Sequence, residues 1–143
     1  TMMKVRDLYP LITTTRLFEA RDFYVRHFGF GVAFEASWFV YLQGAPEEGQ
    51  RGAALAFMHP DHPTCPPGPD SFDGRGMILT IEVADAASVH ERLSTAGAPV
   101  VHPLRDEDWG QRRFMVRDPA GILVDVVQQI DPKPGYWDQY MEL

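Results

Sequence analysis

The chain has 143 residues, of which 45% are hydrophobic and 12% aromatic, so it can bury a core in one domain or two small halves. Thirteen Lys and Arg against 20 Asp and Glu leave a net charge of −7, which argues against nucleic acid as a partner. No apolar run approaches the roughly 20 residues that span a membrane, and the first residues lack the apolar centre of a signal peptide. The single cysteine fits a reducing compartment, so we expect a cytoplasmic protein with no membrane partner.

The first half of the chain predicts a strand, a helix and then three strands. Apolar residues recur at helical spacing over residues 17–28, and Gly29 is placed to end that helix. Pro10 indicates that the first strand lies at the edge of a sheet. The strands are predicted at residues 8–14, 32–35, 38–42 and 53–58.

The second half repeats this order. Asp85 is placed to cap a helix that Gly97 closes, and residues 118–121 predict a tight turn. The strands are predicted at residues 77–83, 99–102, 113–116 and 122–127. The chain is therefore predicted to be α+β, with two tandem βαβββ modules. The predicted parts are a first module at 5–60, a proline-rich crossover loop at 61–76, a second module at 77–130 and a C-terminal tail at 131–143.

Four short motifs carry a resemblance to a known family. They are Arg21-Asp22-Phe23-Tyr24 before Phe28-Gly29, Ile81-Glu82-Val83 before Asp85, the run 109–114 (WGQRRF) and the run 116–121 (VRDPAG). In this order the chain resembles the vicinal oxygen chelate superfamily, which contains glyoxalase I, ring-cleaving dioxygenases, fosfomycin-resistance enzymes and bleomycin-resistance proteins. The resemblance implies that the two modules form an incomplete β-barrel around a cleft. It also implies a homodimer.

The resemblance implies a test for a metal, because metal-dependent members place His or Glu on the first and fourth strands of each module. The matching positions here carry Tyr9, Ala56, Ile78 and Asp125, of which only Asp125 is a metal-ligand type. We therefore expect no metal and no cofactor, with Asp125 and Glu82 as weak candidates for a carboxylate site. The loop run His59-Pro60-Asp61-His62 with Cys65 is a further, less specific candidate.

Aromatic and polar residues on the strands suggest how a small molecule could be held. Alternation along the strands puts Thr80 and Glu82 on one face and Asp125 on a matching face. Trp109 lies in a polar run, which favours a cleft rim, whereas Phe34, Phe39 and Phe57 could equally be core. The predicted ligand-binding residues are Tyr9, Trp38, Phe57, Thr80, Glu82, Trp109, Arg112, Phe114 and Asp125.

Three functions stay open at this point. The first is a bleomycin-resistance-like protein that binds and sequesters an antibiotic without a metal, and the second is a binder of a metabolite. The third is a lyase, isomerase or dioxygenase-type enzyme that uses a divalent metal or acid–base chemistry by Glu82 and Asp125, with catalytic residues unknown. The aromatic tail at 131–143 is expected at the dimer interface, with folding back on its own subunit as the alternative. The loop at 61–76 is either a linker or a flap.

Overall fold

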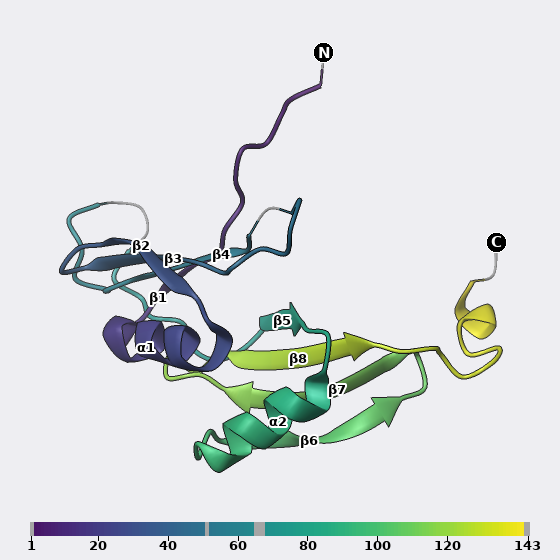
Figure 1. Cartoon of the computed structure of the whole chain (residues 1–143). Coiled ribbons are helices and arrows are strands. Elements are labelled where there is room, and N and C mark those ends of the chain that lie inside the picture. The colour runs from purple at the N-terminus through teal and green to yellow at the C-terminus, as the bar shows by residue number, and fades with distance from the viewer. Residues whose placement is uncertain (1, 51, 65–67, 142–143) are drawn as a thin grey trace. The chain divides into compact units, whose positions relative to one another are not determined.

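A computed structural model of the chain describes residues 2–50, 52–64 and 68–141 (Figure 1). It contains two four-stranded sheets, each accompanied by one helix, which confirms the predicted α+β class. The chain divides into two compact units: Thr1–Arg75 with Pro119–Gly121, and Gly76–Asp118 with Ile122–Leu143. In the described part of the chain, no helix is both long and apolar enough to cross a membrane.

The first unit holds a sheet in the order β1-β4-β3-β2, in which β1 runs parallel to β4 and the other pairs are antiparallel. β1 is shorter than predicted, because Pro10 has no N–H to donate: its carbonyl accepts from the Ala56 N–H at 3.0 Å, but the paired residues of the strand begin at Leu11. β3 likewise starts one residue later than predicted, which leaves Trp38 in the bend before it. The bounds are β1 (Leu11–Thr13), β2 (Gly31–Glu35), β3 (Phe39–Gln43) and β4 (Ala54–Met58).

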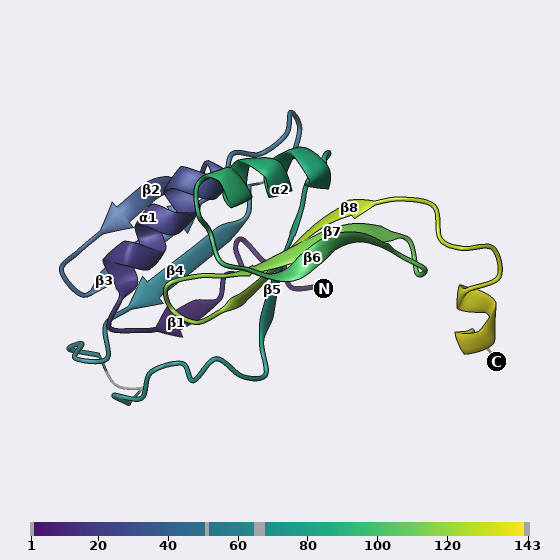
Figure 2. The ribbon, with the colours of Figure 1, turned by 90° about the horizontal axis from the view of Figure 1, so that it is seen from below.

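Helix α1 (Leu17–Phe28) lies along one face of this first sheet (Figure 2). Its Tyr24 ring is fully buried and stacks on Phe57 of β4, with the ring centroids 5.8 Å apart. The helix ends where predicted, at Gly29, whose φ of 69° lies in the left-handed region that glycine adopts without strain. Alternate strand residues therefore point to α1, and the others point to the opposite side, which we call the helix-free face.

The second unit repeats this topology in the order β5-β8-β7-β6, with β5 parallel to β8. β6 and β7 are longer than predicted, because the polar run at 105–107 extends β6 into a hairpin with β7. The turn closes through a hydrogen bond from the Gly110 N–H to the Glu107 carbonyl, 3.0 Å. The bounds are β5 (Ile78–Glu82), β6 (Val100–Glu107), β7 (Gln111–Arg117) and β8 (Leu123–Gln129).

Helix α2 (Ala86–Thr95) covers one face of the second sheet, and Asp85 caps it as predicted. The Asp85 carboxylate accepts a hydrogen bond from the Ser88 N–H at 3.1 Å, which satisfies one of the free donors of the first turn. Leu93 is fully buried, and the His90 ring meets Phe114 of β7 edge-on at 5.0 Å. The second sheet thus has its own helix-free face.

The C-terminal tail contacts the β6–β7 hairpin of its own unit. Its short 3-10 helix η1 (Trp137–Tyr140) places the Trp137 Nε1–H 2.9 Å from the Trp109 carbonyl, and the Lys133 N–H donates to the Asp108 carbonyl at 2.8 Å. Tyr140 remains exposed. A role of this tail in a dimer stays a prediction.

Candidate functional site

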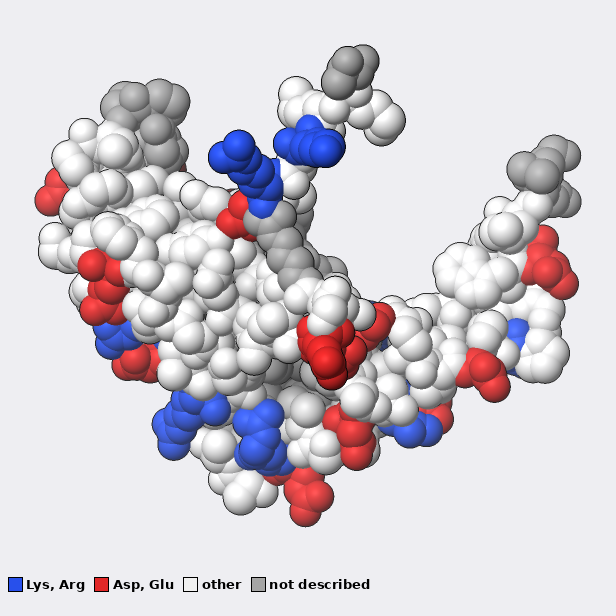
Figure 3. Space-filling view, turned by 45° about the horizontal axis from the view of Figure 1, so that its top comes forward, with Lys and Arg blue, Asp and Glu red and all other residues white. Residues whose placement is uncertain are grey.

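The helix-free face of the first sheet is apolar and rich in aromatic side chains. The strand register aligns Leu11 of β1 with Ala56 of β4, and Ala56 with Tyr41 of β3, so these three residues share the face. Phe39 aligns with Met58 on the same side. In Figure 3 the surface of the first unit that faces the viewer carries few charged side chains. Such a face favours contact with uncharged ligands.

An open hollow of about 430 Å³ lies against this face. Phe39 contacts two other aromatic rings of the hollow. Its ring centroid lies 5.8 Å from that of Trp38 and 6.2 Å from that of Phe34. Among the residues that the structure describes, none of those lining the hollow is ionisable. The hollow is lined by Leu11, Phe34, Ala36, Trp38, Phe39, Met58 and Thr64. The sequence pointed to Trp38, whereas Leu11, Ala36, Met58 and Thr64 come together only through strand pairing and the loop after β4.

Tyr9, in the segment that leads into β1, lies next to Tyr41 of β3. The two rings meet edge-on at 4.9 Å, and the Tyr41 hydroxyl donates a hydrogen bond to the Asp7 carboxylate. This hydrogen bond to a carboxylate raises the pKa of Tyr41 above its usual value. Tyr9 is 41% exposed, so the structure places it at the surface of the first unit, as a candidate contact for a ligand.

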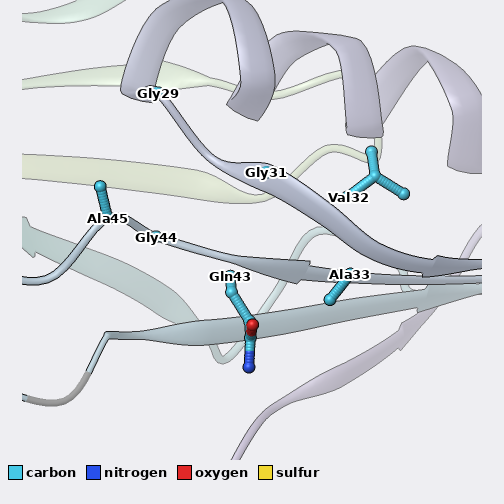
Figure 4. Close-up of a pocket in the computed structure, with 7 residues that line it drawn as sticks. All are labelled: Gly29, Gly31, Val32, Ala33, Gln43, Gly44 and Ala45. Atoms are coloured by element: carbon cyan, nitrogen blue, oxygen red, sulfur yellow. The ribbon is translucent and has the colours of Figure 1, made fainter.

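A second hollow of about 370 Å³ lies at the end of the hairpin formed by β2 and β3 (Figure 4). Its lining is largely backbone, since Gly29, Gly31 and Gly44 contribute no side chains. The pairing of β2 with β3 shifts between Val32 and Phe34, which is a β-bulge. In Figure 4 the Gln43 side chain points away from α1. The lining residues that the structure describes here are neither aromatic nor ionisable.

Phe57 and Phe114, two of the predicted ligand contacts, are core residues. Both have an exposed fraction of 0% and point to the helix of their own unit, Phe57 toward Tyr24 and Phe114 toward His90. The physical reason is strand alternation, because each lies on the side of its strand opposite the helix-free face. Their sequence context could not distinguish the two sides.

Thr80, Glu82 and Asp125 all lie on the helix-free face of the second sheet. Thr80 of β5 aligns directly with Asp125 of β8, and Glu82 aligns with Val127. Thr80 and Glu82 are exposed on the edge strand, and the Glu82 carboxylate accepts a hydrogen bond from the Gln129 amide at 2.8 Å. Asp125 is only 6% exposed, and its burial raises the pKa of its carboxyl group.

Arg112 lies on the other face, because its register partner Gln128 alternates with Val127 along β8. Its guanidinium binds Asp106 through two hydrogen bonds of 2.7 and 3.1 Å. The arginine beside Asp125 is instead Arg113, whose Nη1 lies 3.6 Å from the Asp125 Oδ2. Sequence reasoning missed Arg113, although its alternation with the apolar Phe114 was a usable signal.

Trp109 lies in the turn of the β6–β7 hairpin and is partly buried. Its indole N–H donates to the Gln111 side chain at 2.8 Å, and the Arg113 guanidinium lies over its ring, 4.8 Å from the centroid. The same Arg113 donates to the Glu107 carboxylate at 2.7 Å. Trp109 therefore supports a network of charged side chains on the second unit.

The residues at the four positions where the family resemblance places metal ligands do not fit a metal. Ala56 and Ile78 have no donor atom, and the Tyr9 ring packs on Tyr41. The carboxylate of Asp125 has the cationic Arg113 beside it, which disfavours a divalent ion. Over residues 2–50, 52–64 and 68–141, no three His, Cys, Asp or Glu side chains gather as a metal site would require. Cys65, part of the loop candidate, lies outside the described residues.

Comparison with known proteins finds a matching family and similar relatives. Residues 8–126 match the family described as the Glyoxalase/Bleomycin resistance protein/Dioxygenase superfamily. A bleomycin resistance protein of Geobacillus stearothermophilus is 30% identical over 105 residues, 71% of this chain and 74% of the relative.

Among solved structures, a glyoxalase/bleomycin resistance protein/dioxygenase from Nocardioides has a TM-score of 0.70 at 19% identity and shares the fold, covering 94% of this chain and 91% of its own. TnmS3, an antibiotic binding protein from Streptomyces sp. CB03234, has a TM-score of 0.63 at 25% identity and covers 90% of this chain and 99% of its own. With matching sequence over most of its length and the same repeated sheet-and-helix units, the chain belongs to the glyoxalase/bleomycin resistance protein/dioxygenase superfamily.

Proposed function

We propose that this protein binds a small molecule with a planar aromatic part in the hollow of its first unit and sequesters it without a metal. One observation carries the proposal: the hollow of about 430 Å³ is lined mainly by aromatic and apolar side chains, and no described residue of its lining is ionisable. Its volume is within the range of roughly 300–1,000 Å³ that is usual for small-molecule sites. The ligand is an antibiotic or a metabolite.

The side chains of the hollow suit a flat ring. Phe34, Trp38 and Phe39 offer ring faces and edges within one short stretch of chain, and Phe34 is 58% exposed. A ligand ring that packs against them gains about 0.5–1.5 kcal/mol per aromatic contact beyond the burial of its area. Thr64 supplies a hydroxyl group at the border of the hollow.

The relatives support sequestration over catalysis. The curated relatives are named bleomycin resistance proteins, and TnmS3 is named an antibiotic binding protein. Sequestration requires affinity for the ligand alone, whereas catalysis requires groups that stabilise a transition state. The hollow of the first unit contains apolar walls and one hydroxyl, which is what affinity for an uncharged ring demands.

A homodimer is part of this proposal, with the aromatic tail at 131–143 at its interface. Trp137 is 47% exposed and Tyr140 is 65% exposed after the tail has packed on its own hairpin, so these rings leave apolar area free for a second copy. Light scattering at micromolar concentration measures the mass directly. A single 16.2 kDa species would contradict the dimer.

The binding proposal is tested by calorimetric titration with 2-naphthol, as a neutral flat probe, and with bleomycin, each with and without EDTA. Trp38→Ala should weaken the binding of a probe that uses the hollow by about tenfold, because it removes one ring wall. Phe18→Ala is the control, since it removes an aromatic ring from α1, on the other side of the first sheet, and it should leave the affinity unchanged. Equal affinities of the wild type and Trp38→Ala for every bound probe would refute the site, and loss of binding in EDTA would refute metal independence.

A further inference from the structure

The loop after β4 repeats a short turn that is closed by a histidine side chain. The run 59–64 (HPDHPT) contains the pattern His-Pro-X twice. In the first turn the Asp61 N–H donates to the His59 Nδ1 at 3.0 Å, and in the second the Thr64 N–H donates to the His62 Nδ1 at 3.1 Å. Over the described residues these side chains join no cluster that would hold a metal. The second turn differs from the first because its last residue, Thr64, lines the aromatic hollow of the first unit.

The second turn fixes which nitrogen of His62 carries the proton. A backbone N–H can only donate, so the His62 Nδ1 that accepts from it has a lone pair and no proton. The Thr64 hydroxyl lies 2.9 Å from the same Nδ1. Its other neighbour is the Met58 sulfur, 3.9 Å away, which is a weak acceptor. The Thr64 hydroxyl therefore donates its proton to His62.

This arrangement leaves the Thr64 oxygen as an acceptor. A hydroxyl has one proton to donate, and once that proton is used on His62 the lone pairs of the oxygen remain for another donor. Among the described lining residues, Thr64 alone carries a side-chain oxygen, and the indole N–H of Trp38 can only donate. A ligand in the hollow thus meets one side-chain oxygen, and that oxygen is set to accept.

The surroundings of His62 contribute few titratable groups. In the described part of the chain, its neighbours from other elements are Trp38, with 6.4 Å between the ring centroids, and Met58, which it reaches through Thr64. Neither of these two side chains ionises. The titratable groups beside it are His59 and Asp61 in the same loop.

Protonation of His62 reverses the role of the Thr64 hydroxyl. An imidazole takes up its second proton between about pH 5 and 8, and here the free position is Nδ1. A protonated Nδ1 accepts from neither the N–H nor the hydroxyl of Thr64, and it donates to the hydroxyl oxygen instead. The acceptor that the neutral ring leaves available is then lost.

We propose that His62 is a positioning residue of the aromatic hollow, which holds the Thr64 hydroxyl as an acceptor and so gives the site a preference for a flat aromatic ligand with a ring-bound O–H. This inference rests on the proposed function, since it concerns the same hollow. It adds the chemical class of the ligand, a hydroxylated aromatic ring. It also makes the preference depend on the protonation of one side chain.

The test compares 2-naphthol with 2-methoxynaphthalene, which has the same ring system and no O–H, by fluorescence titration of the full chain. Thr64→Val removes the hydroxyl and keeps the shape, so its ratio of the two affinities is the baseline. At about pH 8 the wild type should favour 2-naphthol about three- to tenfold more than this baseline, because one hydrogen bond is made. At about pH 5 the excess should disappear, while 2-naphthol, like the phenol of tyrosine, keeps its proton.

Three variants separate positioning from a general structural role. His62→Phe keeps a ring beside Trp38 but has no acceptor, so its ratio should fall to that of Thr64→Val. His62→Asn supplies an acceptor to the same turn and takes up no proton in this range, so it should keep the preference at both pH values. His59→Phe is the matched control, because it changes the turn that ends at Asp61. It should match the wild type in its ratio and pH dependence.

The outcomes distinguish this inference from the function on which it rests. If both probes bind and Trp38→Ala weakens both, but the wild type and Thr64→Val have the same ratio, only the role of His62 is wrong. A preference that does not change with pH in the wild type would equally overturn it. If neither naphthalene binds, the inference fails, and the titration with bleomycin decides the proposed function separately. If His62→Phe fails to fold, the pH dependence of the wild type and of His62→Asn still decides.

Discussion

The two units have the same topology and opposite chemistry on their helix-free faces. In the first unit this face carries Leu11, Phe39 and Met58 beside a hollow whose lining, as far as the chain is described, has no ionisable side chain. In the second unit the equivalent face carries Asp125 and Arg113 in a network of charged side chains. The helix-facing sides, in contrast, are both apolar where they meet their helix, although the second also carries the Arg112–Asp106 ion pair. The comparison indicates that packing against the helix restricts one side of each sheet to apolar residues, whereas the other side differs in chemistry between the units, even at buried residues such as Met58 and Asp125.

The largest loss of stability is expected in the cores between sheet and helix, where the two units are alike. Phe57→Ala and Phe114→Ala each remove a fully buried ring that packs on the helix of its unit. Each should lower the free energy of unfolding by about 3–5 kcal/mol, because the loss of burial adds to the cavity that remains. Urea denaturation measures both. A cost below about 1 kcal/mol for either variant would show that its sheet is not packed as described.

The charged network of the second unit is the next test. Glu107→Gln removes the carboxylate that Arg113 and Arg105 share, and Glu107 is only 8% exposed. We expect a loss of about 2–3 kcal/mol in the free energy of unfolding, since two guanidinium groups lose their closest partner. Arg113 is then free to pair with Asp125, so the pKa of Asp125 should fall, as NMR of the carboxyl carbon would report. An unchanged Asp125 pKa would contradict the shared arginine.

A smaller effect, on ligand binding, is expected when a charged side chain like those of the second unit is introduced into the first. Phe34→Glu puts a carboxylate into the wall of the aromatic hollow, at a position that is 58% exposed. Binding of 2-naphthol should weaken by about tenfold, because a charge must lose water when a neutral ring covers it. The free energy of unfolding should change by less than about 1 kcal/mol.

The matched control for this variant is Val101→Glu, which changes an apolar residue of similar exposure, 51%, in the second unit. It should leave 2-naphthol binding as in the wild type. Calorimetry on both variants decides, and equal losses of affinity would mean that the added charge acts at long range rather than in the hollow.

The smallest effect is a pH dependence of stability that arises at Asp125 of the second unit. Burial raises the pKa of Asp125 above its usual 3.8, against the opposing effect of Arg113 and His102 and with a contribution from Glu107. The folded state therefore holds this proton more tightly than the unfolded state. As the pH rises above 3.8, the ionisation of Asp125 costs the folded protein stability, up to the folded-state pKa.

The comparison of wild type with Asp125→Asn isolates this group. Relative to the variant, the wild type should lose stability as the pH rises above 3.8, because the raised pKa disfavours the charged carboxylate in the folded state. Urea denaturation across this range gives the difference directly. A difference that is flat, or that favours the wild type as the pH rises, would contradict a raised pKa.

Local sequence determined the elements and their order. The apolar spacing of residues 17–28 with Gly29 behind it produced α1, and Asp85 produced the start of α2, because capping and helical periodicity act within a few residues. The repeat of strand, helix and three strands was readable for the same reason. Alternation along β8 was likewise enough to place Asp125 on the opposite side of the strand from its apolar neighbours Val124 and Val126.

Tertiary structure alone decided which side chains meet. Alternation says that Arg112 and Arg113 point to opposite sides, but only the pairing of β7 with β8 and β6 shows that Arg113 reaches Asp125 and Glu107. A shift of one residue in that pairing would exchange the two arginines. The hollow of the first unit likewise joins Leu11, Phe34 and Met58 from three strands. Strand register is set by contacts between residues far apart in the chain, and that is why the sequence predicted the sheets but not the neighbours across them.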